Sequence, residues 1–135
     1  MKPERVDPLI YVTDDNMEVL KLVQRKLNNE HYYRVAIFTT YEDMEASFNL
    51  KPHLIILDNY LSKFQDEDTG LNNYKKIKQA LPETKVIILS GETDPEIIRS
   101  FTQEGVYGYI VKDTQSMDKL VSTINSIFGG NISDE

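Results

Sequence analysis

Cysteine is absent from the 135-residue sequence. Without cysteine the chain can form neither a disulfide framework nor a thiolate metal site, which fits a reducing compartment. Long apolar runs are missing as well. No stretch reaches the roughly 18 apolar residues of a membrane span, and the first residues contain no apolar core of a secretory signal. The sequence therefore predicts a soluble, cytoplasmic protein without a membrane partner.

Basic residues are also in short supply. The sequence has 15 Lys and Arg against 22 Asp and Glu, a formal net charge of −7 and a pI of about 4.8. Such a chain is poorly suited to binding a phosphate backbone, so we expect no direct contact with nucleic acid. The length is enough for one hydrophobic core. We expect a single domain over residues 1–135, with a core from about 8 to 129 and short flexible ends.

What the sequence does have is a series of short apolar runs that alternate with amphipathic stretches. The runs are rich in Ile, Val, Leu and Tyr, which is typical of strands buried on both faces of a parallel sheet. The expected strands are residues 9–13, 34–38, 54–58, 85–89 and 107–111.

The amphipathic stretches indicate a helix after each strand. Their apolar stripes are Met17, Leu20, Val23 and Leu27; Met44 and Phe48; Leu71, Tyr74, Ile77 and Leu81; Ile97, Ile98 and Phe101; and Met117, Leu120, Val121, Ile124 and Phe128. Asp94 and Pro95 form an N-cap and a first-turn proline. The alternation predicts the α/β class, as a flavodoxin-like (βα)5 three-layer sandwich around a doubly wound, five-stranded parallel sheet of order 2-1-3-4-5.

Polar side chains follow four of the five expected strands. Asp14 and Asp15 follow the first, Asp58 ends the third, Ser90 ends the fourth and Lys112 follows the fifth. Because the carboxyl ends of parallel strands share one edge of the sheet, we expect these side chains to lie together.

Three carboxylates in one place require a cation. Two of them about 5 Å apart repel by about 3 kcal/mol at an effective dielectric constant near 20. With oxygen ligands only, the favoured ion is Mg²⁺, or else Mn²⁺. A carboxylate beside such an ion, with a lysine and a hydroxyl around it, suits nucleophilic attack on phosphorus.

The motifs that carry these residues are YVTDDN at 11–16, LIILDN at 54–59, VIILSG at 86–91 and GYIVKD at 108–113. In this order they resemble the response-regulator receiver domains of two-component signalling, especially the stand-alone, chemotaxis-regulator-like ones. The resemblance covers residues from about 8 to 129. It implies a protein that accepts a phosphoryl group from a histidine kinase or phosphotransfer protein and hydrolyses it, without being a turnover enzyme.

The resemblance also implies residue roles. Asp58 would be the phosphoryl acceptor, with Ser90 and Lys112 contacting phosphoryl oxygens. Asp58 and Asp15 would bind the metal directly, Asp14 would help through water, and the backbone carbonyl of Tyr60 would complete the site. Ser90 and Tyr109 would form a switch that remodels a partner-binding face made by the fourth helix, the fifth strand and the fifth helix.

Three departures from the family pattern stand out. The loop at 61–70 is longer and acidic. The family's Lys-Pro is Lys112-Asp113 here, which leaves the isomer of that bond open. Tyr60 and Glu92 lie two positions after Asp58 and Ser90, where side chains flank the path of the hydrolytic water in the family.

Other interpretations remain open from the residues alone. Asp14 and Asp15 could be N-caps of the first helix, and Tyr109 could be an ordinary packed strand tyrosine. The main alternative function is a pseudo-receiver that binds proteins without phosphorylation. A haloacid-dehalogenase-type phosphohydrolase would need a second Asp where Tyr60 stands, and a flavodoxin-like carrier would not place two acids in its first phosphate-binding loop.

Overall fold

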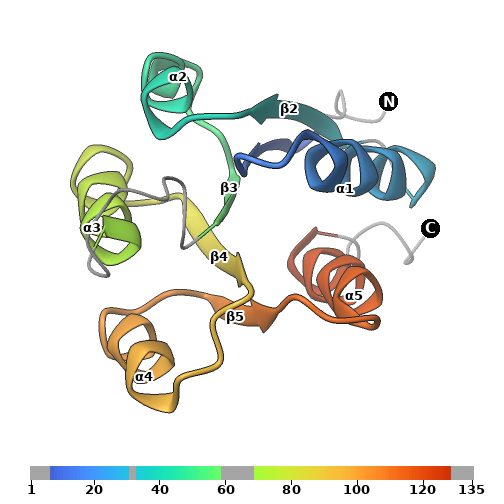
Figure 1. The fold of residues 1–135 in the computed structure, drawn as a ribbon. Helices are drawn as coiled ribbons and strands as arrows, with labels where there is room; N and C mark the ends of the chain where they lie inside the picture. The colour runs from blue at the N-terminus through green and yellow to red at the C-terminus, as the bar shows by residue number, and fades with distance from the viewer. Residues whose placement is uncertain (1–6, 31–32, 59–68, 129–135) are drawn as a thin grey trace.

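The computed structural model describes residues 7–30, 33–58 and 69–128. Strands and helices alternate along the chain, as the sequence predicts (Figure 1). They are β1 (Leu9–Thr13), α1 (Met17–Glu30), β2 (Arg34–Phe38), α2 (Tyr41–Glu45), the 3₁₀ turn η1 (Phe48–Leu50), β3 (Leu54–Leu57), α3 (Thr69–Ala80), β4 (Lys85–Ser90), α4 (Pro95–Gln103), β5 (Gly108–Val111) and α5 (Ser116–Phe128).

The five strands form one parallel sheet in the order β2-β1-β3-β4-β5, which confirms the predicted fold class and strand order. The order reverses between β1 and β3, where the chain changes the face on which its helices pack. This reversal places the carboxyl ends of β1 and β3 next to each other, with Thr13 paired to Leu57. In open α/β sheets, ligands bind at this point.

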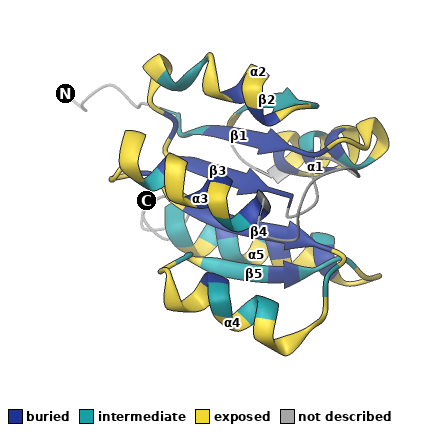
Figure 2. Ribbon diagram, turned by 60° about the vertical axis from the view of Figure 1, so that its left-hand side comes forward, coloured by how far each residue is buried: buried dark blue, intermediate teal, exposed yellow. Residues whose placement is uncertain are grey.

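The core is double, because side chains alternate between the two faces of the sheet. Ile56 and its neighbours on one face pack against Leu20 of α1 and Ile124 of α5. Ile55 and its neighbours on the other face pack against Met44 of α2 and Tyr74 of α3, with α4 covering the same side. Figure 2 shows β1, β3 and β4 mostly buried, and helices whose outer faces are exposed.

β3 is the most completely buried strand. All four of its residues, from Leu54 to Leu57, have an exposed fraction of 1% or less. Burying one such side chain contributes about 1.5–3 kcal/mol to stability. The strand is therefore a fixed support for the residue that follows it, Asp58.

The start of α4 matches the sequence analysis, whereas α1 is capped by a residue that the sequence analysis did not name. The side chain of Asp94 accepts a hydrogen bond from the backbone N–H of Glu96, and Pro95 occupies the first turn of α4, as predicted. Helix α1 is capped by Asn16, whose side-chain oxygen accepts from the N–H of Glu18 at 2.9 Å. Asp14 and Asp15 are therefore not needed as caps and are available for another purpose.

Candidate functional site

Backbone pairing continues one residue past the ends of the strands and fixes the backbone of the candidate site. The N–H of Asp14 donates to the carbonyl of Phe38 at 3.1 Å, and the N–H of Asp58 donates to the carbonyl of Thr13 at 3.0 Å. The N–H of Lys112 donates to the carbonyl of Ser90 at 2.8 Å. Three predicted site residues are thus held by the sheet, although they lie outside its strands.

The three acids that the sequence singles out meet at this edge. Asp14, Asp15 and Asp58 each offer one carboxylate oxygen, and these oxygens lie within 4.8 Å of one another. Asp14 and Asp58 are buried, with exposed fractions of 2% and 4%, whereas Asp15 is exposed. Buried carboxylates at this spacing repel each other strongly, because little water is present to screen them. The arrangement is therefore suited to a positive partner.

Lys112, which directly follows the edge strand β5, supplies one positive partner. Its Nζ donates to Oδ2 of Asp14 at 2.8 Å and lies 3.6 Å from Oδ1 of Asp58. Partial burial by itself lowers the pKa of the Lys112 ammonium, but the carboxylates of Asp14 and Asp58 outweigh this effect, so the pKa lies above its usual value. Lys112 is therefore charged throughout the physiological range.

Asp14 already has a partner on each of its oxygens. Oδ2 accepts from Lys112, and Oδ1 accepts from the backbone N–H of Asn16 at 2.9 Å. The sequence analysis did not single out Asn16 as part of the site. An Asn two residues after an acid and directly before a helix was the available signal, because Asn is a common N-cap.

Ser90, at the end of β4, is completely buried. Its Oγ accepts a hydrogen bond from the N–H of Glu92 at 3.0 Å, which turns the chain into the loop that leads to α4. The hydroxyl can donate as well as accept, so Ser90 can contact a second polar group besides the Glu92 N–H.

Tyr109, on β5, is held by the same loop. Its hydroxyl donates to the backbone carbonyl of Glu92 at 3.1 Å, and its ring lies 5.7 Å from the ring of Phe101, in α4. Burial raises the pKa of the Tyr109 phenol, a hydrogen bond with Ser90 acts in the opposite direction, and the charges of Glu92 and Asp58 raise the pKa further. Ser90 and Tyr109 therefore both bond to Glu92 in one loop, and their role as a switch pair stays a prediction.

Two of the departures from the family pattern involve residues outside the described ranges. Tyr60 and most of the acidic loop at 61–70 lie outside the described residues. Within the described ranges no peptide bond is cis, so the bond between Lys112 and Asp113 is trans.

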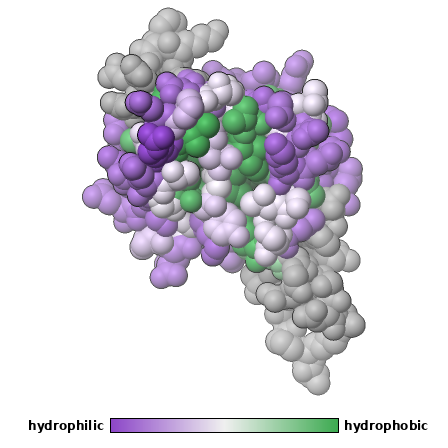
Figure 3. All heavy atoms as spheres, turned by 90° about the horizontal axis from the view of Figure 1, so that it is seen from below, coloured by the Kyte–Doolittle hydropathy of each residue, from purple (hydrophilic) through white to green (hydrophobic). Residues whose placement is uncertain are grey.

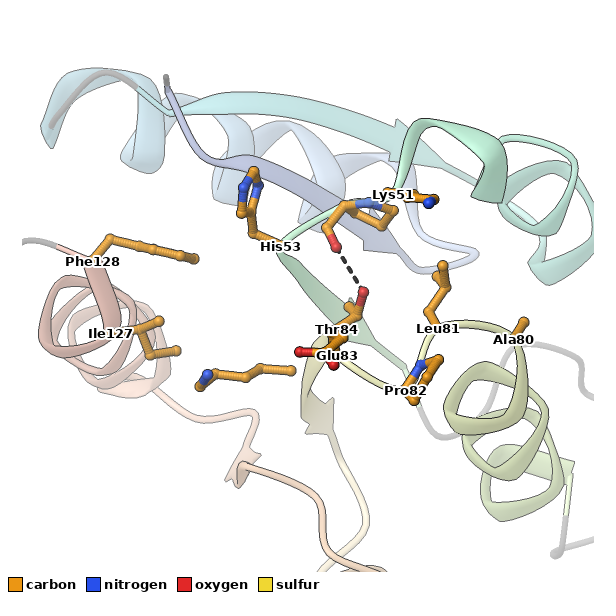
Figure 4. A pocket seen from close by; sticks show the side chains of 11 residues that line it. Lys51, His53, Ala80, Leu81, Pro82, Glu83, Thr84, Ile127 and Phe128 are labelled. Atoms are coloured by element: carbon orange, nitrogen blue, oxygen red, sulfur yellow. Dashed lines mark hydrogen bonds between the residues drawn. The ribbon is translucent and has the colours of Figure 1, made fainter. Parts of the chain in front are cut away.

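A hollow of about 460 Å³ lies at the opposite edge of the sheet, where β4 begins (Figure 4). Leu81, Pro82 and Phe128 line it, and a hydrogen bond from the hydroxyl of Thr84 to the carbonyl of Pro52 crosses its floor. None of the predicted site residues is among the residues that line it. The hollow is therefore separate from the candidate site at the carboxyl edge.

No described helix has the length and apolar character needed to cross a lipid bilayer. This agrees with the absence of long apolar runs from the sequence.

Comparison with known sequences points to one family. The family model described as the response regulator receiver domain matches residues 10–125. The transcriptional regulatory protein MctR of Rhizobium johnstonii is 30% identical over 87 residues, which cover 64% of this chain and 38% of MctR. The two-component response regulator ORR3 of Oryza sativa is 25% identical over 115 residues, covering 83% of this chain and 85% of ORR3. The chain thus spans well under two thirds of MctR.

Solved structures agree. The response regulator DrrB of Thermotoga maritima superposes with a TM-score of 0.79 at 27% identity, covering 93% of this chain and 54% of DrrB. A BeF3-activated DrrB receiver domain superposes with a TM-score of 0.73 at 28% identity, covering 90% of this chain and 97% of that domain. The region matched by the family model, residues 10–125, contains Asp14, Asp15, Asp58, Ser90 and Lys112. With the strand order, the site and the family match in agreement, the chain belongs to the response regulator receiver domains of two-component signalling.

Proposed function

We propose that this receiver domain accepts a phosphoryl group on Asp58 in a Mg²⁺-dependent reaction, with a histidine kinase or a phosphotransfer protein as the donor. The observation that carries the proposal is the setting of Asp58. Its carboxylate is 4% exposed, lies within 4.8 Å of two other carboxylates, and has the Lys112 ammonium at 3.6 Å. Burying a carboxylate among other charges is unfavourable, so this setting at the ligand-binding edge of the sheet points to a functional role.

The residues present fit a divalent cation. All three acids offer hard oxygen ligands, which Mg²⁺ and Mn²⁺ prefer. Both oxygens of Asp14 accept hydrogen bonds, which suits a role through water, and Asp15 and Asp58 would be the direct ligands, as the family resemblance implies. When bound, the ion would neutralise charge on the carboxylates and on the incoming phosphoryl group.

The transfer step needs only groups that this chain and the donor supply. An oxygen of the Asp58 carboxylate attacks the phosphorus of a phosphohistidine. A P–O bond to Asp58 forms while the P–N bond of the donor breaks, and the bonding electron pair returns to the imidazole nitrogen. Lys112 stays protonated and provides a positive charge beside the transferred group, and the Ser90 hydroxyl donates a hydrogen bond to a phosphoryl oxygen.

Water would later hydrolyse the acyl phosphate on Asp58. The domain would thus remove its own phosphoryl group and would not act as a turnover enzyme. Tyr60 and Glu92, two positions after Asp58 and Ser90, are the side chains placed by the sequence to influence that water. A bulky Tyr60 would slow hydrolysis, which a comparison of phosphoryl lifetimes between the parent protein and Tyr60→Asn tests directly.

Output would pass through the face formed by α4, β5 and α5. Phosphorylation adds about −1.5 to −2 charge units, and Ser90 and Tyr109 would respond together because they share the β4–α4 loop. From below, the side on which α4 and β5 lie in Figure 1, hydrophobic side chains gather in the middle of the surface between hydrophilic ones (Figure 3). A surface of this kind suits a downstream protein partner.

Labelling by a small phosphodonor tests the proposal. Acetyl phosphate with Mg²⁺ is expected to phosphorylate the parent protein and not Asp58→Asn, and chelation of the metal is expected to stop the reaction. Glu96→Gln removes an acidic charge from the exposed first turn of α4 and is the matched control, expected to react like the parent. Equal labelling of Asp58→Asn and the parent would refute the assignment.

A further inference from the structure

Glu92 connects three parts of the molecule through three of its own groups. Its N–H donates to Oγ of Ser90 at 3.0 Å, at the end of β4. Its backbone carbonyl accepts from the hydroxyl of Tyr109 at 3.1 Å, on β5. Its carboxylate turns back onto its own loop. A single residue therefore links both predicted switch residues to the loop between β4 and α4.

The carboxylate contacts are the part that depends on the side chain. Oε2 of Glu92 accepts from the N–H of Thr93 at 3.0 Å and from the N–H of Asp94 at 2.9 Å. Both are charge-assisted hydrogen bonds, which are shorter and stronger than neutral ones. Asp94 is itself the N-cap of α4, so the carboxylate also fixes the point at which that helix begins.

The loop that contains Glu92 is mostly exposed. Gly91, Thr93 and Asp94 are exposed, and residues 91–94 belong to no helix or strand. Segments with few buried contacts open at low free-energy cost. The two hydrogen bonds to the Glu92 carboxylate therefore help to keep the loop in this conformation.

The position of Tyr109 depends on the loop in turn. Its ring lies against Phe101 of α4, and its hydroxyl bonds to the Glu92 carbonyl. If the loop rearranges, that carbonyl moves away and the tyrosine loses its acceptor. The ring would then redistribute between positions according to packing alone.

We propose that the Glu92 carboxylate is a positioning residue that holds the β4–α4 loop and, through it, keeps Tyr109 docked beside Ser90. The assignment of Ser90 and Tyr109 as switch residues rests on the proposed function. The hydrogen bonds of the Glu92 carboxylate, in contrast, are present in the unphosphorylated protein. Glu92 sets the resting position of the switch and thereby the response that phosphorylation has to produce.

The test uses the unphosphorylated, metal-free protein, so it does not depend on phosphoryl transfer. The eight tyrosines are labelled with 3-fluorotyrosine, and Tyr109→Phe identifies the ¹⁹F signal of Tyr109. Glu92→Ala is expected to shift that signal and reduce the ratio of docked to undocked ring roughly 5- to 10-fold, because two charge-assisted bonds are lost from a half-exposed site. Glu92→Gln, which retains an acceptor oxygen, is expected to preserve most of the parent signal.

Glu96→Ala is the control, since it removes the same charge four positions further along without removing an acceptor for these N–H groups. Hydrogen exchange of the Thr93 and Asp94 amides provides a second measurement, with faster exchange expected in Glu92→Ala only. The tyrosine signals far from the loop report whether each variant is folded. A Tyr109 signal and amide exchange in Glu92→Ala like those of the parent would overturn the proposal, as would an equal shift in Glu96→Ala.

Discussion

The ammonium of Lys112 donates a hydrogen bond to the buried carboxylate of Asp14, at 2.8 Å, across 98 positions of sequence. The same nitrogen lies 3.6 Å from Asp58. Lys112 is thus shared between two acids, and in this structure it is closer to Asp14. Under the proposed function, a phosphoryl group on Asp58 would compete for this ammonium, and Lys112 would then respond to the modification.

Replacing Lys112 is expected to affect the response to phosphorylation without affecting Mg²⁺ binding. Lys112→Ala is expected to retain Mg²⁺ binding, because all three acids remain, but to lose the response to phosphorylation. Calorimetric titration measures the first property, and phosphorylation-dependent shifts of the amide signals of β5 measure the second. Lys119→Ala, which removes an exposed lysine from α5, is the control. Amide shifts of normal size in Lys112→Ala would contradict this role.

Magnesium is expected to stabilise the folded protein. A ligand that binds only the native state at 100 times its dissociation constant contributes about 2.7 kcal/mol. Asp15→Asn removes an exposed carboxylate for which the described residues provide no hydrogen-bond or ion-pair partner. The midpoint of the Mg²⁺ effect on thermal unfolding should therefore rise ~10-fold or more, as expected on losing one of few charged ligands. Glu18→Gln, in the first turn of α1, should leave the midpoint unchanged. Identical midpoints for Asp15→Asn and the parent would remove Asp15 from the metal site.

The pKa of Lys112 predicts a pH dependence of stability. Because the folded-state pKa lies above the ordinary value of 10.5, the pairing stabilises the protein fully below about pH 10.5 and is lost as the pH rises through the folded-state value. The difference in unfolding free energy between the parent and Lys112→Met should therefore be constant from pH 7 to about 9 and shrink in strong alkali. Urea unfolding at several pH values measures it. A difference that already falls between pH 7 and 9 would show that Lys112 is not held by the acids.

Gly91, before α4, and Gly105, after it, allow a test of the backbone conformation at Gly105. Gly105 has a φ of +95°, which an L-residue rarely adopts, whereas a Cβ added at Gly91 meets no atom within 4 Å and no positive φ is recorded there. Gly105→Ala is expected to cost about 1–2 kcal/mol of stability because of this backbone conformation. Gly91→Ala is expected to change stability by less than about 0.5 kcal/mol. Equal effects in chemical denaturation would show that the φ at Gly105 is not required.

The fold and the membership of the site were readable from the sequence because both depend on strand periodicity. Continuous apolar runs such as 54–57 mark strands buried on both faces, and in a parallel sheet the residues after such runs must meet at one edge. The strand limits differ by one residue at most, since Asp58 follows β3 and Ser90 closes β4. The sequence therefore predicts that Asp14, Asp15, Asp58, Ser90 and Lys112 share one edge, and the structure brings the three acids and Lys112 together.

Contacts made by turns were not readable in the same way. The two partners of Asp14, the cap by Asn16 and the links made by Glu92 depend on loop conformation, which hydrophobic patterning does not encode. Any of several nearby polar residues could have made these hydrogen bonds, because Asp, Asn and Glu all accept from backbone N–H groups. Only the path of the backbone decides between them.

The central claim is that Asp58 forms the covalent bond to phosphorus. The most direct measurement treats the protein with acetyl phosphate and Mg²⁺, reduces the acyl phosphate with borohydride, and locates the modified residue by peptide mass spectrometry. The account predicts that position 58 is converted to homoserine and that no other acid is changed. Reduction at Asp14 or Asp15 instead, or an unmodified position 58 in protein that carries the label, would contradict it.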